Sequence, residues 1–255
     1  MEEPRVVAVV GARGGCGSTT LTANLAVELA SSRTVCALDL DFGRGDLAGL
    51  LNLSPAVSIP KLLTDSLDPA KLRGSALSAG PRCSILAQPT ELSQLVRPTR
   101  EEVTHLLDVA RQTWDLVLVD CGDSVSEAML AAVHVADRVM IVATADVLAI
   151  QNVVRLLALL REVGISDDRR WLVLSQMFRY PDLSEADIEA LLKVKIHATF
   201  RRDHPACADA ARNGKIVKEL HGSSDFVRDI AAAWDKLTEK PAPANTWKFW
   251  PGSLR

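Results

Sequence analysis

The sequence predicts an α/β protein in which helices cover both faces of a doubly wound, mainly parallel sheet. Three observations lead to this prediction. Short, almost entirely apolar runs alternate along the chain with stretches of helical character, as in parallel sheets that are buried on both faces. A cluster of glycines lies between the first apolar run and the first helical stretch. Aspartates directly follow two of the apolar runs.

The first half of the chain begins with the β-branched run from Arg5 to Val10. The glycines after this run lead into a helix that we expect from Ser18 to about Ser31. A second strand, with the sequence TVCAL, ends at acidic residues, and two short helices and a further strand follow it. The expected strands lie at 5–10, 34–38 and 84–87, and the expected short helices at 58–65 and 69–73.

The second half of the chain carries clear signals for the starts of helices. Thr99 with Glu102 three residues later forms a capping-box pattern, and Asp146 and Ser184 are typical N-cap residues. The helices at 146 and 184 are expected to run to about 163 and to 192. Apolar strands separate the helical stretches. The expected strands lie at 116–119, 139–143, 171–174 and 196–200, and the other helices at 124–136, 205–212 and 223–237.

Composition limits the class of protein. The 255 residues are 48% hydrophobic and 4% aromatic, with a formal net charge of -3, which disfavours a strongly basic nucleic-acid-binding protein. The five cysteines form no CxxC pair, and no uncharged run approaches the ~20 residues of a membrane span. We expect one domain over 1–238, a tail with prolines and tryptophans over 239–255, and a cytoplasmic location.

The segment from Gly11 to Thr20, GARGGCGSTT, lies where a phosphate-binding loop would lie. Glycines let successive backbone N–H groups converge on an anion, and the next helix adds the positive end of its dipole. A hydroxyl just inside the helix, that of Thr19, can ligate Mg²⁺. The usual pattern GxxxxGK[ST] fails, because Ala12 replaces the first glycine and Ser18 the lysine. Judged alone, the loop could also be a tight turn between strand and helix.

Acidic residues at the ends of strands favour the phosphate-binding interpretation. Asp39 and Asp41 follow the second strand, Asp46 lies near them, and Asp120 ends the strand at 116–119. Ligands of open parallel sheets bind beyond the carboxyl ends of the strands, so these carboxylates would face the same crevice as the glycine loop. Aspartates in loops and at helix N-caps are common, and this alternative explains any one of them.

The glycine segment resembles a known motif. ARGGCGSTT is similar to the deviant Walker A motif KGGxGKTT of the ParA/MinD family of P-loop ATPases, with Arg13 at the signature-lysine position and Ser18 at the Walker-lysine position. The segment 39–47, DLDFGRGDL, resembles DLDLQFGD of the CpaE/TadZ branch, and 114–120, WDLVLVD, resembles its Walker B strand. The resemblance spans about Val6 to Leu237 and implies a P-loop NTPase fold of the MinD/ParA type.

The resemblance implies a role for each matched residue. Asp41 would position the attacking water, Asp120 would be the Walker B acid, and Asp39 would support the metal shell. Thr19, Asp41 and Asp120 would hold Mg²⁺ when ATP or ADP is bound. Arg13 would reach across a homodimer to the nucleotide of the other subunit. The nucleotide-binding residues would be Arg13, Gly14, Gly15, Cys16, Gly17, Ser18, Thr19 and Thr20.

Departures from the family pattern bear on activity. Ser18 cannot place a full charge on the β- and γ-phosphates, and losing such a contact commonly costs about 10²–10³ in rate. Ser175-Gln176 stands where the family usually has Asn-Arg, and 201–203, RRD, where it has Pro-Asn-Asp. We therefore expect an ATP-binding homodimer with weak or absent hydrolysis. The alternative is a pseudo-ATPase scaffold that works without nucleotide.

The resemblance also implies a cellular role. It is that of a positioning or assembly factor at a pole or septum, with partners among Tad-type pilus and secretion proteins or cell-division proteins. A DNA-partition ATPase like ParA is a further alternative, supported only by the basic clusters at 169–170, 201–202 and 212–218. We expect DNA not to be a partner, because solvated helix faces carry similar runs. The aromatic segment WKFW at 247–250 could bring the chain to the inner face of a membrane.

Overall fold

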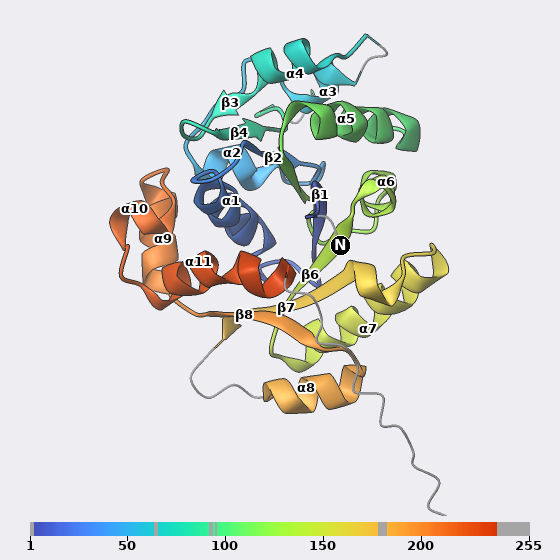
Figure 1. Cartoon of the computed structure of the whole chain (residues 1–255), viewed down its shortest axis with the longest axis vertical. Coiled ribbons are helices and arrows are strands. Elements are labelled where there is room, and N and C mark those ends of the chain that lie inside the picture. The colour runs from blue at the N-terminus through green and yellow to red at the C-terminus, as the bar shows by residue number, and fades with distance from the viewer. Residues whose placement is uncertain (1–2, 64–65, 92–93, 95, 178–182, 239–255) are drawn as a thin grey trace, which may run out of the picture.

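One twisted sheet organises the structure (Figure 1). The computed structural model describes residues 3–63, 66–91, 94, 96–177 and 183–238. Within them eight strands pair in the order β3-β4-β2-β5-β1-β6-β7-β8, and every pair is parallel except β3 with β4. The strands are β1 (Val6–Gly11), β2 (Val35–Asp39), β3 (Leu77–Ser78), β4 (Cys83–Leu86), β5 (Leu116–Asp120), β6 (Arg138–Thr144), β7 (Arg170–Met177) and β8 (Ile196–Arg201). The predicted doubly wound, mainly parallel sheet is confirmed.

Helices cover both faces of this sheet, as Figure 1 shows. One layer contains α3 (Ile59–Leu62), α4 (Pro69–Ser75), α5 (Arg100–Thr113), α6 (Glu127–Val135), α7 (Val147–Glu162) and α8 (Glu185–Leu192). The other contains α1 (Ser18–Leu29), α2 (Asp46–Leu50), α9 (His204–Arg212), α10 (Val217–Leu220) and α11 (Asp225–Thr238). A single-turn 3-10 helix, η2 (Asp167–Arg169), precedes β7. Among the described residues, none of the helices combines the length and apolar character needed to cross a bilayer.

The central strand β1 contains no polar side chain, and its place in the sheet explains this. Its side chains alternate between the two faces, and each face is covered by helices. Val6, Ala8 and Val10 pack in the layer of α5 to α8, whereas Val7 and Val9 pack in the layer of α1 and α11. All five side chains are buried. Since β1 lies between β5 and β6, this strand holds the loop that follows it at the centre of the sheet's carboxyl edge.

Local signals place most helix ends where the sequence predicts them. Thr99 and Glu102 form the capping box of α5, and Asp146 and Ser184 cap α7 and α8 through their side chains. The helix expected from 124 begins instead at Glu127, because the Ser126 side chain accepts the Met129 N–H and is the N-cap. Residues 124–126 therefore belong to the loop after β5.

Four elements were not predicted: α2, β3, η2 and α10. The helix α2 lies in a segment that contains three glycines, which are poor helix formers. It forms because the Leu47 N–H donates to the buried Asp39 carboxylate at 3.1 Å, so the helix begins on a side chain from the preceding strand. The strand β3 has only two residues and exists through its antiparallel pairing with β4. The tail at 239–255, including the aromatic segment at 247–250, lies outside the described residues.

The basic residues of the predicted clusters make contacts within the chain. Arg169 donates to carbonyl oxygens at the carboxyl end of α6, where exposed carbonyls and the helix dipole favour a cation. Arg170 is buried and donates to the carbonyl oxygens of Ser166 and Leu157. Ion pairs also involve the other clusters, and they include Arg201 with Asp225 and Asp229, Arg212 with Asp209, Lys215 with Glu219 and Lys218 with Glu28.

The pairing of β2 with β5 places two buried aspartates side by side. Asp39 and Asp120 are direct partners in the register of these strands and are almost completely inaccessible to solvent. Burial raises the pKa of Asp39 well above its ordinary value, and the nearby Asp120 charge adds to the effect. Burial also raises the pKa of Asp120, to about 6, against a hydrogen bond from Thr19 that lowers it. The fold thus keeps two carboxyl groups where ionisation is unfavourable.

These aspartates should make the stability of the ligand-free protein depend on pH. When folding raises the pKa of an aspartate, the unfolding free energy falls as the pH rises from the unfolded pKa to the folded pKa, and stays low above it. For Asp120 this interval runs from 3.8 to about 6, which corresponds to at most about 3 kcal/mol. Asp120→Asn should therefore raise the unfolding free energy by about 1–3 kcal/mol at pH 8 and change it little at pH 4.

The measurement is urea denaturation in the presence of a chelator. Glu101→Gln, which removes an exposed carboxylate from α5, is the matched control and should leave the pH dependence as it is in the wild type. If Asp120→Asn lost the same stability at both pH values, the Asp120 carboxyl group would be a net stabilising contact and the burial argument would be wrong.

Candidate functional site

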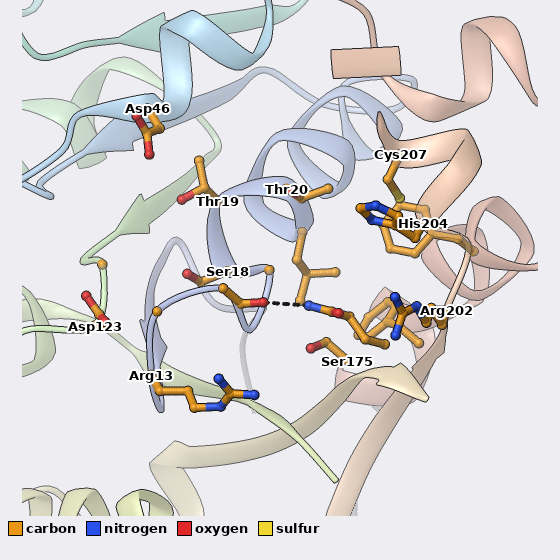
Figure 2. A pocket seen from close by; sticks show the side chains of 18 of the residues that line it. Arg13, Ser18, Thr19, Thr20, Asp46, Asp123, Ser175, Arg202, His204 and Cys207 are labelled. Atoms are coloured by element: carbon orange, nitrogen blue, oxygen red, sulfur yellow. Dashed lines mark hydrogen bonds between the residues drawn. The ribbon is translucent and has the colours of Figure 1, made fainter. Parts of the chain in front are cut away.

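A cavity of about 430 Å³ lies at the carboxyl edge of the sheet, where the loops after β1, β2, β5, β7 and β8 meet. Its two ends differ in character. Arg13, Thr19, Asp46 and Asp123 lie on one side, and Ser175, Arg202, His204 and Cys207 lie on the other (Figure 2). Phe200 and Phe226 also line the cavity. The predicted residues that line this cavity are Arg13, Gly14, Gly15, Gly17, Ser18, Thr19, Thr20, Asp41 and Asp46.

The glycine loop presents open backbone to this cavity. Gly15 and Gly17 have φ values of 79° and 88°, which residues with a Cβ rarely adopt. Apart from Gly15 itself and its two chain neighbours, no residue has a heavy atom within 4 Å of the place where a Cβ on Gly15 would stand. Gly17 is the N-cap of α1, and no side chain caps that end of the helix. The first N–H groups of α1 therefore have no side-chain cap and suit an anion such as a phosphate.

Neighbouring strands hold the loop in this shape. The Gly11 N–H donates to the Gly122 carbonyl oxygen at 2.8 Å, and the Ala12 N–H donates to a carbonyl of β6. On the far side, the Ser175 hydroxyl donates to the Cys16 carbonyl oxygen, and the Gln176 side-chain amide donates to the Gly15 carbonyl oxygen at 2.6 Å. Gln176 adopts φ 53°, an uncommon conformation for this residue type. The loop is thus shaped before any ligand binds.

Asp41 is the carboxylate that reaches the cavity from the β2 side. One of its oxygens accepts the N–H groups of Gly43 and Arg44, at 3.0 and 3.2 Å. Its Cγ lies 2.6 Å from where a Cβ on Gly122 would stand, so only glycine allows this approach. Gly122 has φ 66° as well, and a side chain there would be excluded twice, by space and by backbone conformation.

The other two predicted carboxylates lie behind the cavity wall. Asp39 accepts the N–H groups of Asp41 and Leu47 and so fixes the turn after β2. Asp120 accepts the Gly122 N–H at 3.3 Å and a hydrogen bond from the Thr19 hydroxyl. Neither lines the cavity. They position Asp41, Thr19 and the loops instead of facing a ligand directly.

These residues fit Mg²⁺ only together with a phosphate. Thr19 and Asp41 line the cavity and Asp120 lies next to Thr19. Within the described part of the chain no group of three or more His, Cys, Asp or Glu side chains could hold a metal ion. Mg²⁺ in phosphate sites takes one or two protein ligands, the phosphates and water. The donor set is therefore consistent with a metal that arrives with its nucleotide, and Thr19 and Asp41 are the side chains that would hold it.

Three further predicted site residues make contacts that the sequence did not indicate. Arg13 forms an ion pair with Asp146, the N-cap of α7, at 3.0 Å. The Ser18 hydroxyl lies 3.2 Å from where a Cβ on Gly11 would stand. Cys16 is buried and does not line the cavity, and burial raises the pKa of its thiol, which is typical of an unreactive cysteine.

Sequence reasoning missed Arg44 and Asp123, which both line the cavity. Their side chains form an ion pair at 3.5 Å between the loop after β2 and the loop after β5. Their position in the sequence is the available signal, because Arg44 lies three residues after Asp41 and Asp123 lies three residues after Asp120. Gln176 departs from the family pattern in the sequence, but its contact with the glycine loop depends on the pairing of distant strands.

Curated relatives with similar sequences carry the name septum site-determining protein MinD. The relative from Emiliania huxleyi is 28% identical over 166 residues, which are 64% of this chain and 60% of that protein. The relative from Oltmannsiellopsis viridis is 28% identical over 222 residues, which are 84% of this chain and 69% of that protein. The chain thus spans less than two thirds of the length of the first of these relatives.

Solved structures share the fold at lower identity. A ParA family ATPase from Chlorobium tepidum superposes with a TM-score of 0.83 at 22% identity, covering 90% of this chain and 98% of that one. MinD from Pyrococcus horikoshii, in complex with Mg-ADP, gives 0.79 at 17% identity over 92% and 96%. MinD in a MinC:MinD complex from Aquifex aeolicus gives 0.79 at 21% identity over 94% and 97%.

A family model gives the assignment. The model described as ParA, NUBPL iron-transfer P-loop NTPase, matches residues 3–166, which are more than half of the 255 residues. The matched region contains the glycine loop, Asp41 and Asp120, the residues on which the site is built. The chain belongs to the ParA family of P-loop NTPases.

Proposed function

We propose that this chain is a nucleotide-binding positioning or assembly factor of the MinD/ParA kind, which works as a homodimer and hydrolyses ATP very slowly or not at all. One observation carries the proposal. An open glycine loop and an uncapped helix N-terminus face a row of aspartates, and Ser18 stands where the family has a lysine. Backbone N–H groups can hold a triphosphate with Mg²⁺, but phosphoryl transfer needs more positive charge than this loop supplies.

Two observations support a role in positioning. The curated relatives are named for septum site determination, and one similar structure is a MinC:MinD complex. The segment 39–47 resembles the CpaE/TadZ branch, which acts in Tad-type pilus and secretion assembly. The partners we propose are therefore cell-division or pilus and secretion proteins, met at a pole, a septum or the inner membrane face. Both roles need a subunit whose binding surface for partners differs between its ATP-bound and ADP-bound states.

A scaffold that works without nucleotide is the second candidate. Ser18 and the Gln176 contact with Gly15 favour it, because the loop is held by the protein alone. DNA partition has less support, since Arg169 and Arg170 donate to carbonyl oxygens of their own chain and Lys218 pairs with Glu28. Phosphate contacts on DNA need side chains that are available for them. The iron chemistry in the family description is not part of the proposal, because the cysteines form no CxxC pair.

Nucleotide binding is the first test. Titration calorimetry with ATP, ADP and GTP in the presence of Mg²⁺ should show ATP binding by the wild type. Thr19→Val keeps the shape of the side chain and removes the hydroxyl that would ligate Mg²⁺, so ATP affinity should fall about tenfold to a hundredfold. Thr104→Val on α5, outside the cavity, is the matched control. Absence of heat with all three nucleotides at millimolar concentration would leave the scaffold as the better proposal.

Turnover is the second test. Wild-type phosphate release should be very slow, because nothing at position 18 can neutralise charge developing on the transferred phosphoryl group. Ser18→Lys should raise the rate, provided that Asp41 and Thr19 are placed for catalysis. Ser18→Met introduces a side chain of a length similar to lysine but without charge, and should not raise the rate. Rapid release by the wild type that Asp41→Ala abolishes would contradict the argument from Ser18.

Assembly is the third test. Sedimentation should show a dimer that is tighter with ATP than with ADP, since a ligand with equal affinity for both states cannot act as a switch. Arg13→Ala should weaken the dimer formed with ATP, because Arg13 would leave Asp146 for the phosphates across a two-fold axis. Arg155→Ala, on the exposed face of α7, is the control. A dimer that ignores both nucleotide and Arg13 would again favour the scaffold.

A further inference from the structure

An arginine from a neighbouring loop lies directly over the glycine loop. Arg44 belongs to the loop between β2 and α2, and its guanidinium nitrogens lie 3.2 and 3.3 Å from where a Cβ on Gly14 would stand. Its backbone N–H donates to Asp41, so the same turn places an acidic and a basic side chain in the cavity. Any side chain at Gly14 would displace this guanidinium. The close packing shows that Arg44 is part of the cavity wall.

The contact that Arg44 makes in the ligand-free protein is weak. Its ion pair with Asp123 is 3.5 Å long, and the Arg44 side chain is 54% exposed. Exposed ion pairs of this kind contribute little to stability, because water screens them. A phosphate group offers a guanidinium two parallel, charge-assisted hydrogen bonds. Exchange of Asp123 for a phosphate therefore costs little and gains a stronger contact.

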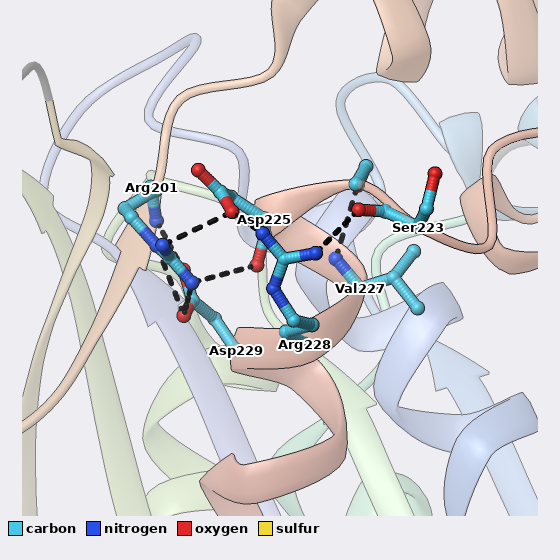
Figure 3. Close-up of polar contacts among 7 residues, drawn as sticks. Arg201, Ser223, Asp225, Val227, Arg228 and Asp229 are labelled. Carbon is cyan, nitrogen blue, oxygen red and sulfur yellow. Dashed lines mark hydrogen bonds and ion pairs between the residues drawn. The ribbon is translucent and has the colours of Figure 1, made fainter.

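Two other arginines of the cavity are held more firmly. Arg201 contacts both carboxylate oxygens of Asp229, at 2.7 and 3.0 Å, and pairs with Asp225 at 3.1 Å. Figure 3 shows that both aspartates come from α11 and converge on this one side chain. Arg13 pairs with Asp146 at 3.0 Å. Of these three arginines, Arg44 has the longest ion pair.

The position of Arg44 also places it at one end of the cavity. Gly14, Asp41 and Asp123 surround it, at the end where Mg²⁺ and the terminal phosphates would lie. The ring of Phe200 lines the part reached by β8, among residues that would face a base or ribose. Without a cation, the carboxylates of Asp41, Asp46 and Asp123 would repel a triphosphate. Positive charge is therefore favourable at this end, and Ser18 does not provide it.

We propose that Arg44 binds the γ-phosphate of ATP, so that bound ATP has a positively charged partner although position 18 has none for the transferred phosphoryl group. This inference rests on the proposed function, since it assigns a residue to the same nucleotide site. Arg44 leaves Asp123 when ATP binds, and its loop closes on the glycine loop. ADP has no γ-phosphate and leaves the pair with Asp123 in place. Arg44 therefore makes the affinity of the site differ between ATP and ADP, which a nucleotide switch needs.

The test compares binding of ATP and ADP, with Mg²⁺, to the full chain by titration calorimetry. Arg44→Ala should weaken ATP binding about tenfold to a hundredfold and ADP binding less than about threefold. Arg44→Lys keeps the charge without the planar fork, and should recover part of the loss. Arg100→Ala is the matched control: Arg100 is also 54% exposed and pairs with a carboxylate, that of Glu127, outside the cavity. It should change neither affinity.

Each outcome separates this inference from the proposed function. If the wild type binds neither nucleotide, the proposed function fails and the inference fails with it. If the wild type binds ATP and Arg44→Ala binds it equally well, only the inference is wrong. An equal loss for ATP and ADP would also overturn it, because Arg44 would then act by shaping the loop. The melting temperature of ligand-free Arg44→Ala should match that of the wild type, which confirms that the fold is intact.

Discussion

The site depends on one close approach, that of three loops at Gly122. The Gly122 carbonyl oxygen accepts the N–H of Gly11, where the glycine loop begins, and its own N–H donates to Asp120. Asp41 from the loop after β2 lies 2.6 Å from the place of its missing Cβ. A Cβ would push this loop away, and the positive φ of Gly122 would be strained for any other residue. The loops after β1, β2 and β5 follow adjacent strands, and a glycine at this position allows them to approach this closely.

The meeting of these three loops also brings the charged side chains of the site together. Two aspartates, Asp39 and Asp120, are buried side by side and organise backbone N–H groups, while Asp41 reaches the cavity. Burying carboxylates without a cation is unfavourable, and their raised pKa values express this. Three arginines that line the cavity, Arg13, Arg44 and Arg201, form ion pairs with carboxylates. A ligand that brings Mg²⁺ and phosphates would satisfy both sets of charges, and this is the electrostatic argument for a nucleotide site.

The rest of the fold supports this arrangement from a distance. The central strand β1 is buried on both faces, so the glycine loop starts from a strand that is packed on both sides. At the opposite edge, Arg5 and Arg169 donate to carbonyl oxygens at the carboxyl ends of α5 and α6. Helices of a parallel sheet direct their N-termini toward the ligand edge, and arginines at their other ends complement the dipoles. The carboxyl edge of the sheet therefore carries the cavity, whereas the opposite edge carries arginines that bind the carboxyl ends of helices.

The sequence by itself determined the elements whose signals are local. Apolar runs marked seven strands, and the capping residues Thr99, Asp146 and Ser184 marked helix starts, because these signals act within a few residues. The glycine loop and Asp41 were also recognisable. Strand β3 and helix α2 were not, since β3 exists only by pairing with β4 and α2 begins on the Asp39 carboxylate.

Which polar side chains reach the cavity was decided by the tertiary structure alone. Asp39, Asp41 and Asp120 look equivalent in the sequence, yet only Asp41 lines the cavity and the other two are buried behind it. Arg44 and Asp123 become a pair because β5 lies between β1 and β2. Strand order is set by the packing of the whole sheet, and the direction of a side chain at a strand end depends on that order. The pattern of residues in the chain shows neither the strand order nor these side-chain directions.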